Sequence, residues 1–173
     1  MSKPPHLSSQ IRSMVHGDLE RVLLWRNHPD VRCNMYTQHE ITLDEHQRWF
    51  ERALSDSKRT LLIFEVEQQP LGYINFNETG SGGVADWGFL VAPDAPKGSG
   101  RQLGQAALHH AFAQLQLHKV CGQVLAYNQR SIRFHQSLGF KEEGTLRDQY
   151  FDGNCYHHVI CFGLLSHEWL LST

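Results

Sequence analysis

The sequence predicts an α/β fold with one mixed, mostly antiparallel sheet flanked by helices. Apolar residues at helical spacing alternate along the chain with short runs of β-branched and aromatic residues. Three of these runs follow one another in the middle of the chain, which argues against a doubly wound parallel sheet. The 173 residues, 40% of them hydrophobic, suffice for a core without disulfide or metal support. We therefore expect a single domain over residues 1–173.

Local signals mark the ends of the expected helices. Pro29 stops or restarts the first helix, because proline lacks a backbone N–H. The second helix begins at Thr42, which forms a capping-box pattern with Glu45. Asn128 is suited to cap a short late helix, and Gly139 is suited to the position just after its end.

The expected strands are separated by polar or glycine-rich turns. Residues 67–70 and 80–83 divide the three central strands, and Asp152-Gly153 is a strong hairpin signal. The resulting order is β-α-α-β-β-β-α-β-α-β-β. The elements cover residues 7–15, 18–27, a helix from 42, 60–66, 71–76, 84–91, 98–117, 119–127, 128–139, 140–149 and 154–165.

Composition excludes several classes of protein. Lys and Arg number 16 and Asp and Glu 18, for a net charge of -2, which argues against a nucleic-acid binder. No apolar run is long enough to span a membrane, and the residues before position 7 lack the apolar stretch of a secretory signal. The four cysteines include no C-x-x-C pair, so we expect reduced thiols in a cytoplasmic protein. The 12 histidines show no zinc-site spacing, and no metal is predicted.

The first candidate functional motif is a strand followed by a glycine-rich turn, which begins the longest helix. Gly98 and Gly100 let backbone N–H groups converge at the start of that helix, which predicts a cradle for a pyrophosphate. Lys97 and Arg101 add positive charge. Neither a P-loop nor a dinucleotide fingerprint fits, because the glycine spacing and the mid-chain position differ from both.

A second stretch is the helix that begins at Asn128 and ends in Leu138-Gly139-Phe140. Together the two stretches resemble the GNAT acyltransferases, which use acetyl-CoA. The resemblance implies a central sheet splayed in a V, with the strands from Val84 and Lys119 parallel and the coenzyme inserted between them. The coenzyme-binding residues it implies are Leu90, Val91, Lys97, Gly98, Ser99, Gly100, Arg101, Gln102, Asn128, Ser131 and Phe134.

The same resemblance implies direct attack of an amine on the acetyl thioester in a ternary complex. A backbone N–H of Leu90 or Val91 is expected to stabilise the developing oxyanion. Asp86, Glu78 or a water chain is expected to accept the amine proton. His135 stands where many family members have a tyrosine acid, and Gln102 stands where glycine or alanine is usual. We expect His135 to donate a hydrogen bond to the leaving thiolate.

The front of the chain contains Trp25-Arg26-Asn27-His28-Pro29-Asp30-Val31-Arg32, then Met35-Tyr36, then His46-Gln47-Arg48-Trp49-Phe50. With the tail at 144–150 and 156–158, these residues resemble one GNAT branch, the N-acetyltransferases of UDP-4-amino-4,6-dideoxy-N-acetyl-β-L-altrosamine in pseudaminic acid biosynthesis, a route to flagellin or surface glycans. The resemblance implies a small-molecule nucleotide-sugar acceptor and a monomer or homodimer. The predicted acceptor-binding residues are Arg26, Met35, Tyr36, Trp49 and Phe50. Because Trp49 and Phe50 are adjacent on a helix, only one of them is expected to line the site.

Two other functions compete with this one. The element R-N-x-P-x-V-R, which begins at Arg26, is shared with ribosomal-protein N-terminal acetyltransferases, so a protein or peptide acceptor is the first alternative. The second is a non-catalytic module that binds acyl-CoA, suggested by the missing tyrosine at position 135.

Overall fold

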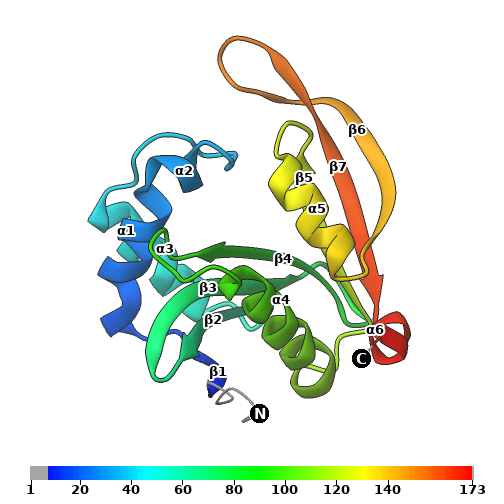
Figure 1. Cartoon of the computed structure of the whole chain (residues 1–173). Coiled ribbons are helices and arrows are strands. Elements are labelled where there is room, and N and C mark those ends of the chain that lie inside the picture. The colour runs from blue at the N-terminus through cyan, green and yellow to red at the C-terminus, as the bar shows by residue number, and fades with distance from the viewer. Residues whose placement is uncertain (1–7, 173) are drawn as a thin grey trace, which may run out of the picture.

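The computed structural model describes residues 8–172 and shows a single seven-stranded sheet with helices on both faces (Figure 1). The strands are β1 Ser9–Ser13, β2 Arg59–Val66, β3 Gln69–Glu78, β4 Val84–Val91, β5 Lys119–Leu125, β6 Lys141–Phe151 and β7 Tyr156–Leu165. The helices are η1 His16–Asp18, α1 Leu19–Asn27, α2 Pro29–Arg32, α3 Leu43–Leu54, α4 Ser99–His109, η2 His110–Gln114, α5 Gln129–Ser137 and α6 Ser166–Ser172.

The sheet has the order β1-β2-β3-β4-β5-β7-β6, and only the β4–β5 pair is parallel. These two strands are paired from Val84 opposite Lys119 to Asp86 opposite Cys121 and then diverge. The sheet therefore opens between β4 and β5 towards the end of β4. The predicted fold class, the parallel pair and the V-shaped opening are confirmed.

Helices cover the two faces of the sheet unequally. On one face α4 and α5 pack over a core that includes Leu103, Ile132 and Phe162. On the other face α1 and α3 pack over the β2–β4 half through residues such as Val22 and Phe50. The β5–β7 half has no helix on that second face (Figure 1). This leaves an open flank beside the divergence of β4 and β5.

The predicted capping signals are present. The Thr42 hydroxyl accepts from the Glu45 N–H at 3.2 Å, and the Glu45 carboxylate accepts from the Thr42 N–H at 2.8 Å. Asn128 Oδ1 accepts from the Ser131 N–H at 3.1 Å, and Gly139 has a φ of 89° that favours glycine.

Several elements differ from the sequence expectation. The helix expected over 98–117 changes at His110 to a wider π-helical turn, in which the Leu115 N–H reaches the His110 carbonyl. Helix α6 was not expected. The first strand begins at Ser9, and residue 7 of its expected range lies outside the described residues.

The β6–β7 hairpin extends beyond the body of the molecule (Figure 1). Nearly every residue of β6 is exposed. The four cysteines are free thiols. Within residues 8–172, no helix combines the length and the apolar character needed to cross a membrane.

Candidate active site

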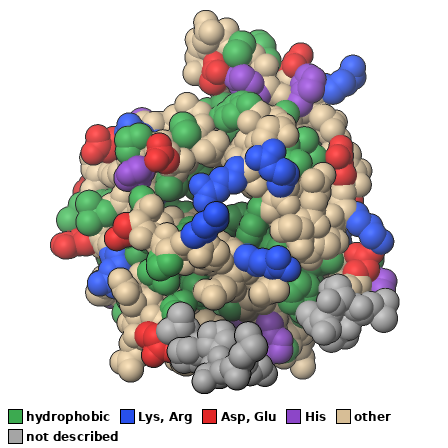
Figure 2. Space-filling view, viewed as in Figure 1, with side chains coloured by type: hydrophobic (Ala, Val, Ile, Leu, Met, Phe, Trp, Pro, Cys, Tyr) green, Lys and Arg blue, Asp and Glu red, His purple; other side chains and the backbone are tan. Residues whose placement is uncertain are grey.

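A cavity of about 1130 Å³ lies where β4 and β5 diverge. Residues of α1, α3 and the loop between α2 and α3 line one end, and residues of α5 and the start of α4 line the other. Figure 2 shows a hollow in this face of the molecule with Lys and Arg side chains around it. The cavity therefore joins two binding regions, one on each side of the open sheet.

The free edge of β4 offers backbone N–H groups to this cavity. The Ala92 N–H donates to the Leu71 carbonyl on the β3 side at 2.8 Å. Because N–H groups alternate along a strand, the Leu90 N–H also faces β3, whereas those of Phe89 and Val91 face the opening. Of the two N–H groups expected from sequence to stabilise the oxyanion, that of Val91 faces the opening and that of Leu90 does not; Phe89, which also faces it, was not among the predicted residues.

The glycine-rich turn meets the cavity at one residue, Gly100. A Cβ atom at Gly100 would contact only Val91 Cγ2, at 3.8 Å, so a ligand can approach the backbone here. Gly98 has a φ of 97°, which a side chain would strain. The buried Ser99 donates its hydroxyl to the Pro96 carbonyl at 2.7 Å. Its side chain therefore serves the turn itself, and only its backbone is available to a ligand.

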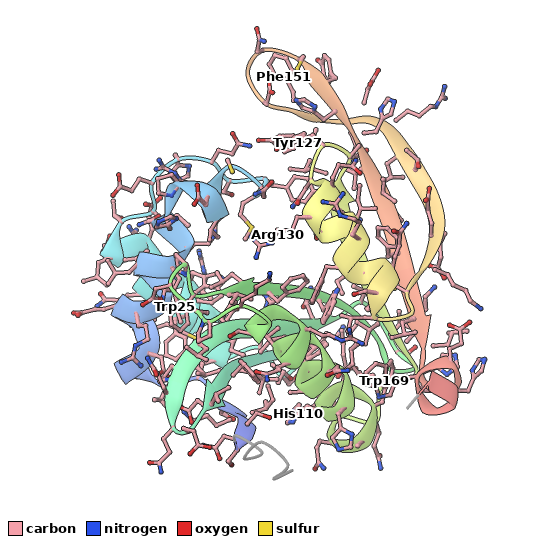
Figure 3. All side chains as sticks on the ribbon, in the orientation of Figure 1. Trp25, His110, Tyr127, Arg130, Phe151 and Trp169 are labelled. Carbon is pink, nitrogen blue, oxygen red and sulfur yellow. The ribbon has the colours of Figure 1, made fainter. Side chains whose placement is uncertain are left out.

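Positive side chains gather at the α4–α5 end. Lys97, Arg101 and Gln102 are exposed beside the cavity but are not among its lining residues. Arg130 and Arg133, one turn apart on α5, do line it, and Figure 3 shows Arg130 extending from α5 towards the α1–α2 side. Across residues 8–172, none of these four cations forms an ion pair. Sequence reasoning missed the two α5 arginines, although their i, i+3 spacing after Asn128 was a usable signal.

The wall of the cavity on α5 includes three residues that the sequence analysis assigned to coenzyme binding: Asn128, Ser131 and Phe134. The Phe134 ring lies 4.8 Å from the Phe89 ring. This contact places an apolar surface beside the free edge of β4.

His135 is a buried residue with both ring nitrogens in use. It is 2% exposed, its Nε2 accepts from Trp87 Nε1 at 3.1 Å, and its Nδ1 donates to the Ser131 carbonyl at 2.8 Å. Burial lowers its pKa, so the ring is neutral. The predicted acid role does not fit this geometry, because no N–H is left to point at a thiolate.

The two predicted carboxylates are placed differently. Asp86 lines the cavity at the point where β4 and β5 part, and the surrounding protein raises the pKa of its carboxyl by desolvation. Glu78 lies at the end of β3 and is not among the residues lining the cavity. The structure therefore brings Asp86, and not Glu78, to the site.

Four of the five predicted acceptor residues line the other end of the cavity: Arg26, Met35, Tyr36 and Trp49. The Tyr36 hydroxyl donates to Gln123 Oε1 at 3.0 Å, which holds the ring across the opening. Phe50 is 1% exposed and belongs to the core between α3 and the sheet, so its assignment to the site was wrong. Only one of the adjacent pair, Trp49, faces the cavity.

Three buried polar atoms at this end have no hydrogen-bond partner: Arg26 Nη1, His46 Nε2 and Tyr73 Oη. All three residues line the cavity, and the polar neighbour of the Tyr73 hydroxyl is Asn75. Burial and the nearby Arg32 lower the pKa of Arg26. Buried polar groups are normally satisfied, so these atoms are available to a polar ligand in the cavity. Sequence reasoning missed His46 and Tyr73.

Comparison with known proteins identifies the fold and the chemistry. The family model described as an acetyltransferase (GNAT) domain matches residues 10–141. The chain belongs to the GNAT acetyltransferase family. It is accordingly an N-acetyltransferase that uses acetyl-CoA, and the expected family is confirmed.

Individual GNAT relatives differ in their acceptors. Spermidine N(1)-acetyltransferase of Vibrio cholerae is 23% identical over 163 residues, covering 92% of this chain and 94% of that protein. Acetyltransferase PseH of Campylobacter jejuni is 28% identical over 141 residues, covering 81% and 83%. A crystal structure of the Vibrio spermidine N-acetyltransferase with CoA and spermine has a TM-score of 0.86 at 24% identity, covering 94% of this chain and 98% of that one.

The geometry of this GNAT chain fits its coenzyme. Acetyl-CoA supplies the acetyl group as a thioester on a long flexible arm with phosphates at its far end. The free edge of β4 and the apolar wall of Phe134 offer an extended, partly apolar path. Gly100, at the start of α4, and the α5 arginines offer an anion-binding end.

Proposed function

We propose that the chain acetylates the 4-amino group of a nucleotide sugar of the UDP-4-amino-4,6-dideoxy-N-acetyl-altrosamine type, in pseudaminic acid biosynthesis. The observation that carries this proposal is Arg26. Its guanidinium is half-buried, donates to the Thr37 carbonyl at 3.1 Å, and keeps Nη1 buried without a partner. A half-buried guanidinium with a free N–H favours an anionic partner, and the diphosphate of a nucleotide sugar supplies one.

The charge balance of the cavity favours an anionic acceptor over a polyamine. Arg26 lines the acceptor end together with the carboxylates Glu45 and Asp86, whereas Arg130 and Arg133 line the opposite end. Glu45 is already engaged by the N–H and hydroxyl of Thr42 in the helix cap. Only Asp86 remains free for a cationic ligand, which is too little for a spermidine-type acceptor with several ammonium groups.

The acceptor end also offers flat, polarisable surfaces suited to a nucleobase. Met35, Tyr36 and Trp49 line the cavity beside Arg26. The Trp49 ring stacks on the His46 ring with centroids 5.1 Å apart, which fixes its orientation. The likeness to Acetyltransferase PseH agrees with this acceptor. The likeness to spermidine acetyltransferases is of comparable strength, so the charge of the cavity decides our choice.

For the coenzyme, we assign the phosphates to the backbone at Gly100 and to Arg130 and Arg133, with Lys97 and Arg101 adding long-range attraction. The N–H groups of Phe89 and Val91 would bind the arm and hold the oxygen that carries charge during transfer. These assignments rest on the positions of the residues around the cavity.

For the chemistry, we assign proton acceptance to Asp86. It lies at the junction of the two ends of the cavity, and its raised pKa makes it a better base than an ordinary aspartate. The departing thiol has a pKa of about 8.5, so it can leave as a thiolate without a side-chain acid. His135 would then position α5 and β4 and would not transfer a proton.

The direct test is thiol release from acetyl-CoA with three acceptors at equal concentration: the UDP-4-amino-4,6-dideoxy sugar, spermidine and a ribosomal-type N-terminal peptide. Release with the sugar alone supports the proposal. Release with spermidine alone or with the peptide alone refutes the proposed nucleotide-sugar acceptor, although the assignment to the GNAT family would still hold.

A pair of variants tests the role of the cation. Arg26→Gln should raise the KM for the sugar between about tenfold and a hundredfold, because a hydrogen bond to a charged group contributes roughly 1.5–3 kcal/mol. The KM for acetyl-CoA should stay unchanged. Arg48→Gln is the matched control, since Arg48 pairs with Asp44 on the exposed side of α3. Equal effects of the two variants would contradict the assignment.

A further inference from the structure

The tip of the β6–β7 hairpin brings together three side chains of different metal-ligand type. Asp152, Cys155 and His157 each offer one donor atom, and these atoms lie within 4.8 Å of one another. Asp152 and Cys155 are exposed and His157 is partly exposed. From this convergence we propose that the hairpin tip is a binding site for a zinc-class divalent cation, separate from the acetyl-transfer cavity.

The spacing of the donor atoms is close to that of a tetrahedral zinc site. With zinc–ligand distances of about 2.0–2.3 Å, neighbouring donors in a tetrahedron lie about 3.3–3.6 Å apart. Here Cys155 Sγ is 3.3 Å from His157 Nε2 and 3.6 Å from Asp152 Oδ2. The third edge, His157 Nε2 to Asp152 Oδ2, is a direct contact of 2.6 Å. It needs to open by about 0.7 Å to admit the ion.

The three contacts join the same three atoms, one from each side chain, and this arrangement differs from that of a catalytic relay. In a Cys-His-Asp relay, the histidine uses one ring nitrogen for the thiol and the other for the carboxylate. Here His157 Nε2 faces both Cys155 Sγ and Asp152 Oδ2. Donors that share one focus are arranged for an ion at that focus.

Backbone N–H groups hold Asp152, and an aromatic ring holds His157, before any ion arrives. Asp152 Oδ1 accepts from the N–H groups of Asn154 and Cys155, both at 2.8 Å, which leaves Oδ2 directed at the cluster. The His157 ring contacts the edge of Tyr127, with centroids 4.8 Å apart. Little ordering is therefore required on binding.

The donor set selects the metal. A thiolate with an imidazole and a carboxylate suits Zn²⁺, whereas Mg²⁺ and Ca²⁺ prefer oxygen ligands alone. Binding replaces the thiol proton of Cys155, which is released to solvent. Exposure of the tip leaves the fourth position to water. The spacing D-x-x-C-x-H matches no familiar zinc pattern, which is why the sequence predicted no metal.

Cobalt is the probe for this site, because a cobalt–thiolate bond absorbs in the near ultraviolet. The full chain, freed of metal and kept reduced, is titrated with Co²⁺ and then with Zn²⁺. We expect one equivalent of Co²⁺ to produce the thiolate band and Zn²⁺ to abolish it. Cys155→Ser should remove the band and weaken binding by more than the roughly 10–100-fold that loss of an outer-shell partner costs.

Cys33→Ser is the matched control, since Cys33 is another exposed thiol and its variant should keep the band. Two results would overturn the proposal. One is the absence of a thiolate band in the wild-type protein at stoichiometric Co²⁺. The other is a band that survives Cys155→Ser. A second measurement guards against misfolding: Zn²⁺ should raise the Tm of the wild-type protein and leave that of His157→Gln unchanged.

Discussion

Burial of His135 leads to a quantitative prediction about pH and stability. In the folded protein the ring is neutral, because burial lowers its pKa and both nitrogens are hydrogen-bonded. In the unfolded chain its pKa is about 6.5. Below that pH the unfolded state binds more protons than the folded state. The stabilising contribution is therefore fully present above pH 6.5 and is lost as the pH falls.

The magnitude follows from the protonation of the unfolded chain. If His135 stays neutral in the folded state, its protonation on unfolding lowers the free energy of unfolding by about 1.4 kcal/mol between pH 7.5 and 5.5. Burial also lowers the pKa values of His46 and His110, and these residues act in the same direction. The contribution of His135 must therefore be isolated with a variant.

The variant is His135→Gln, whose Oε1 can still accept from Trp87 Nε1 but cannot titrate in this range. The free energy of unfolding is measured in urea at pH 7.5 and at pH 5.5. Its decrease between these two pH values should be about 1.4 kcal/mol smaller in the variant than in the wild type. An unchanged pH dependence would refute the reasoning, because it would mean that the buried ring accepts a proton without cost.

The same variant tests catalysis. If His135 only positions its neighbours, kcat at pH 7.5 should fall less than tenfold, whereas loss of a general acid costs about 10²–10⁴-fold. A decrease in that larger range, with the variant folded, would restore the acid role.

Three further predictions concern single residues. Gly122→Ala should destabilise the fold by about 1–3 kcal/mol, because its Cβ would lie 2.6 Å from His135 Nε2. Gly144→Ala is the control, since a Cβ at Gly144 meets open space. The two variants are compared by thermal unfolding, and equal Tm values would contradict the close packing at Gly122. Asp86→Asn should lower kcat by about 10²–10⁴ while calorimetric acetyl-CoA affinity is kept; undiminished turnover excludes Asp86 as the base. Asn128→Ala should cost about 1 kcal/mol through the lost helix cap, measured by urea unfolding, and no loss would mean that water replaces the cap.

The fold could be predicted from sequence because its signals are local. Capping residues such as Thr42 and Asn128 act within one helical turn, and their hydrogen bonds form as expected. The change of period at the central strands located the sheet, and β4 has the boundaries expected. The π-helical turn at His110 was missed because its i, i+5 bonds leave no trace in the apolar pattern.

The site was only partly predictable, because much of it depends on contacts between distant elements. Gly100 and Asn128 belong to continuous motifs, and both line the cavity. Arg26 Nη1 is buried without a partner and Arg26 Nη2 donates to the Thr37 carbonyl, so the environment of this side chain cannot be read from its neighbours in sequence. Trp49 and Phe50 are both apolar neighbours on α3, and only packing against the sheet decides that Phe50 belongs to the core.

His135 lies where β4, β5 and α5 meet, at the start of the opening. Extending the β4–β5 register past Asp86 would place Trp87 opposite Gly122, just where pairing stops. A Cβ at Gly122 would meet both Trp87 Nε1, at 2.9 Å, and His135 Nε2, so the hydrogen bond between these side chains lies over the glycine. That bond links β4 to α5 at the start of the opening. With both ring nitrogens in hydrogen bonds, His135 connects α5 to β4 and has no N–H left to direct at a thiolate.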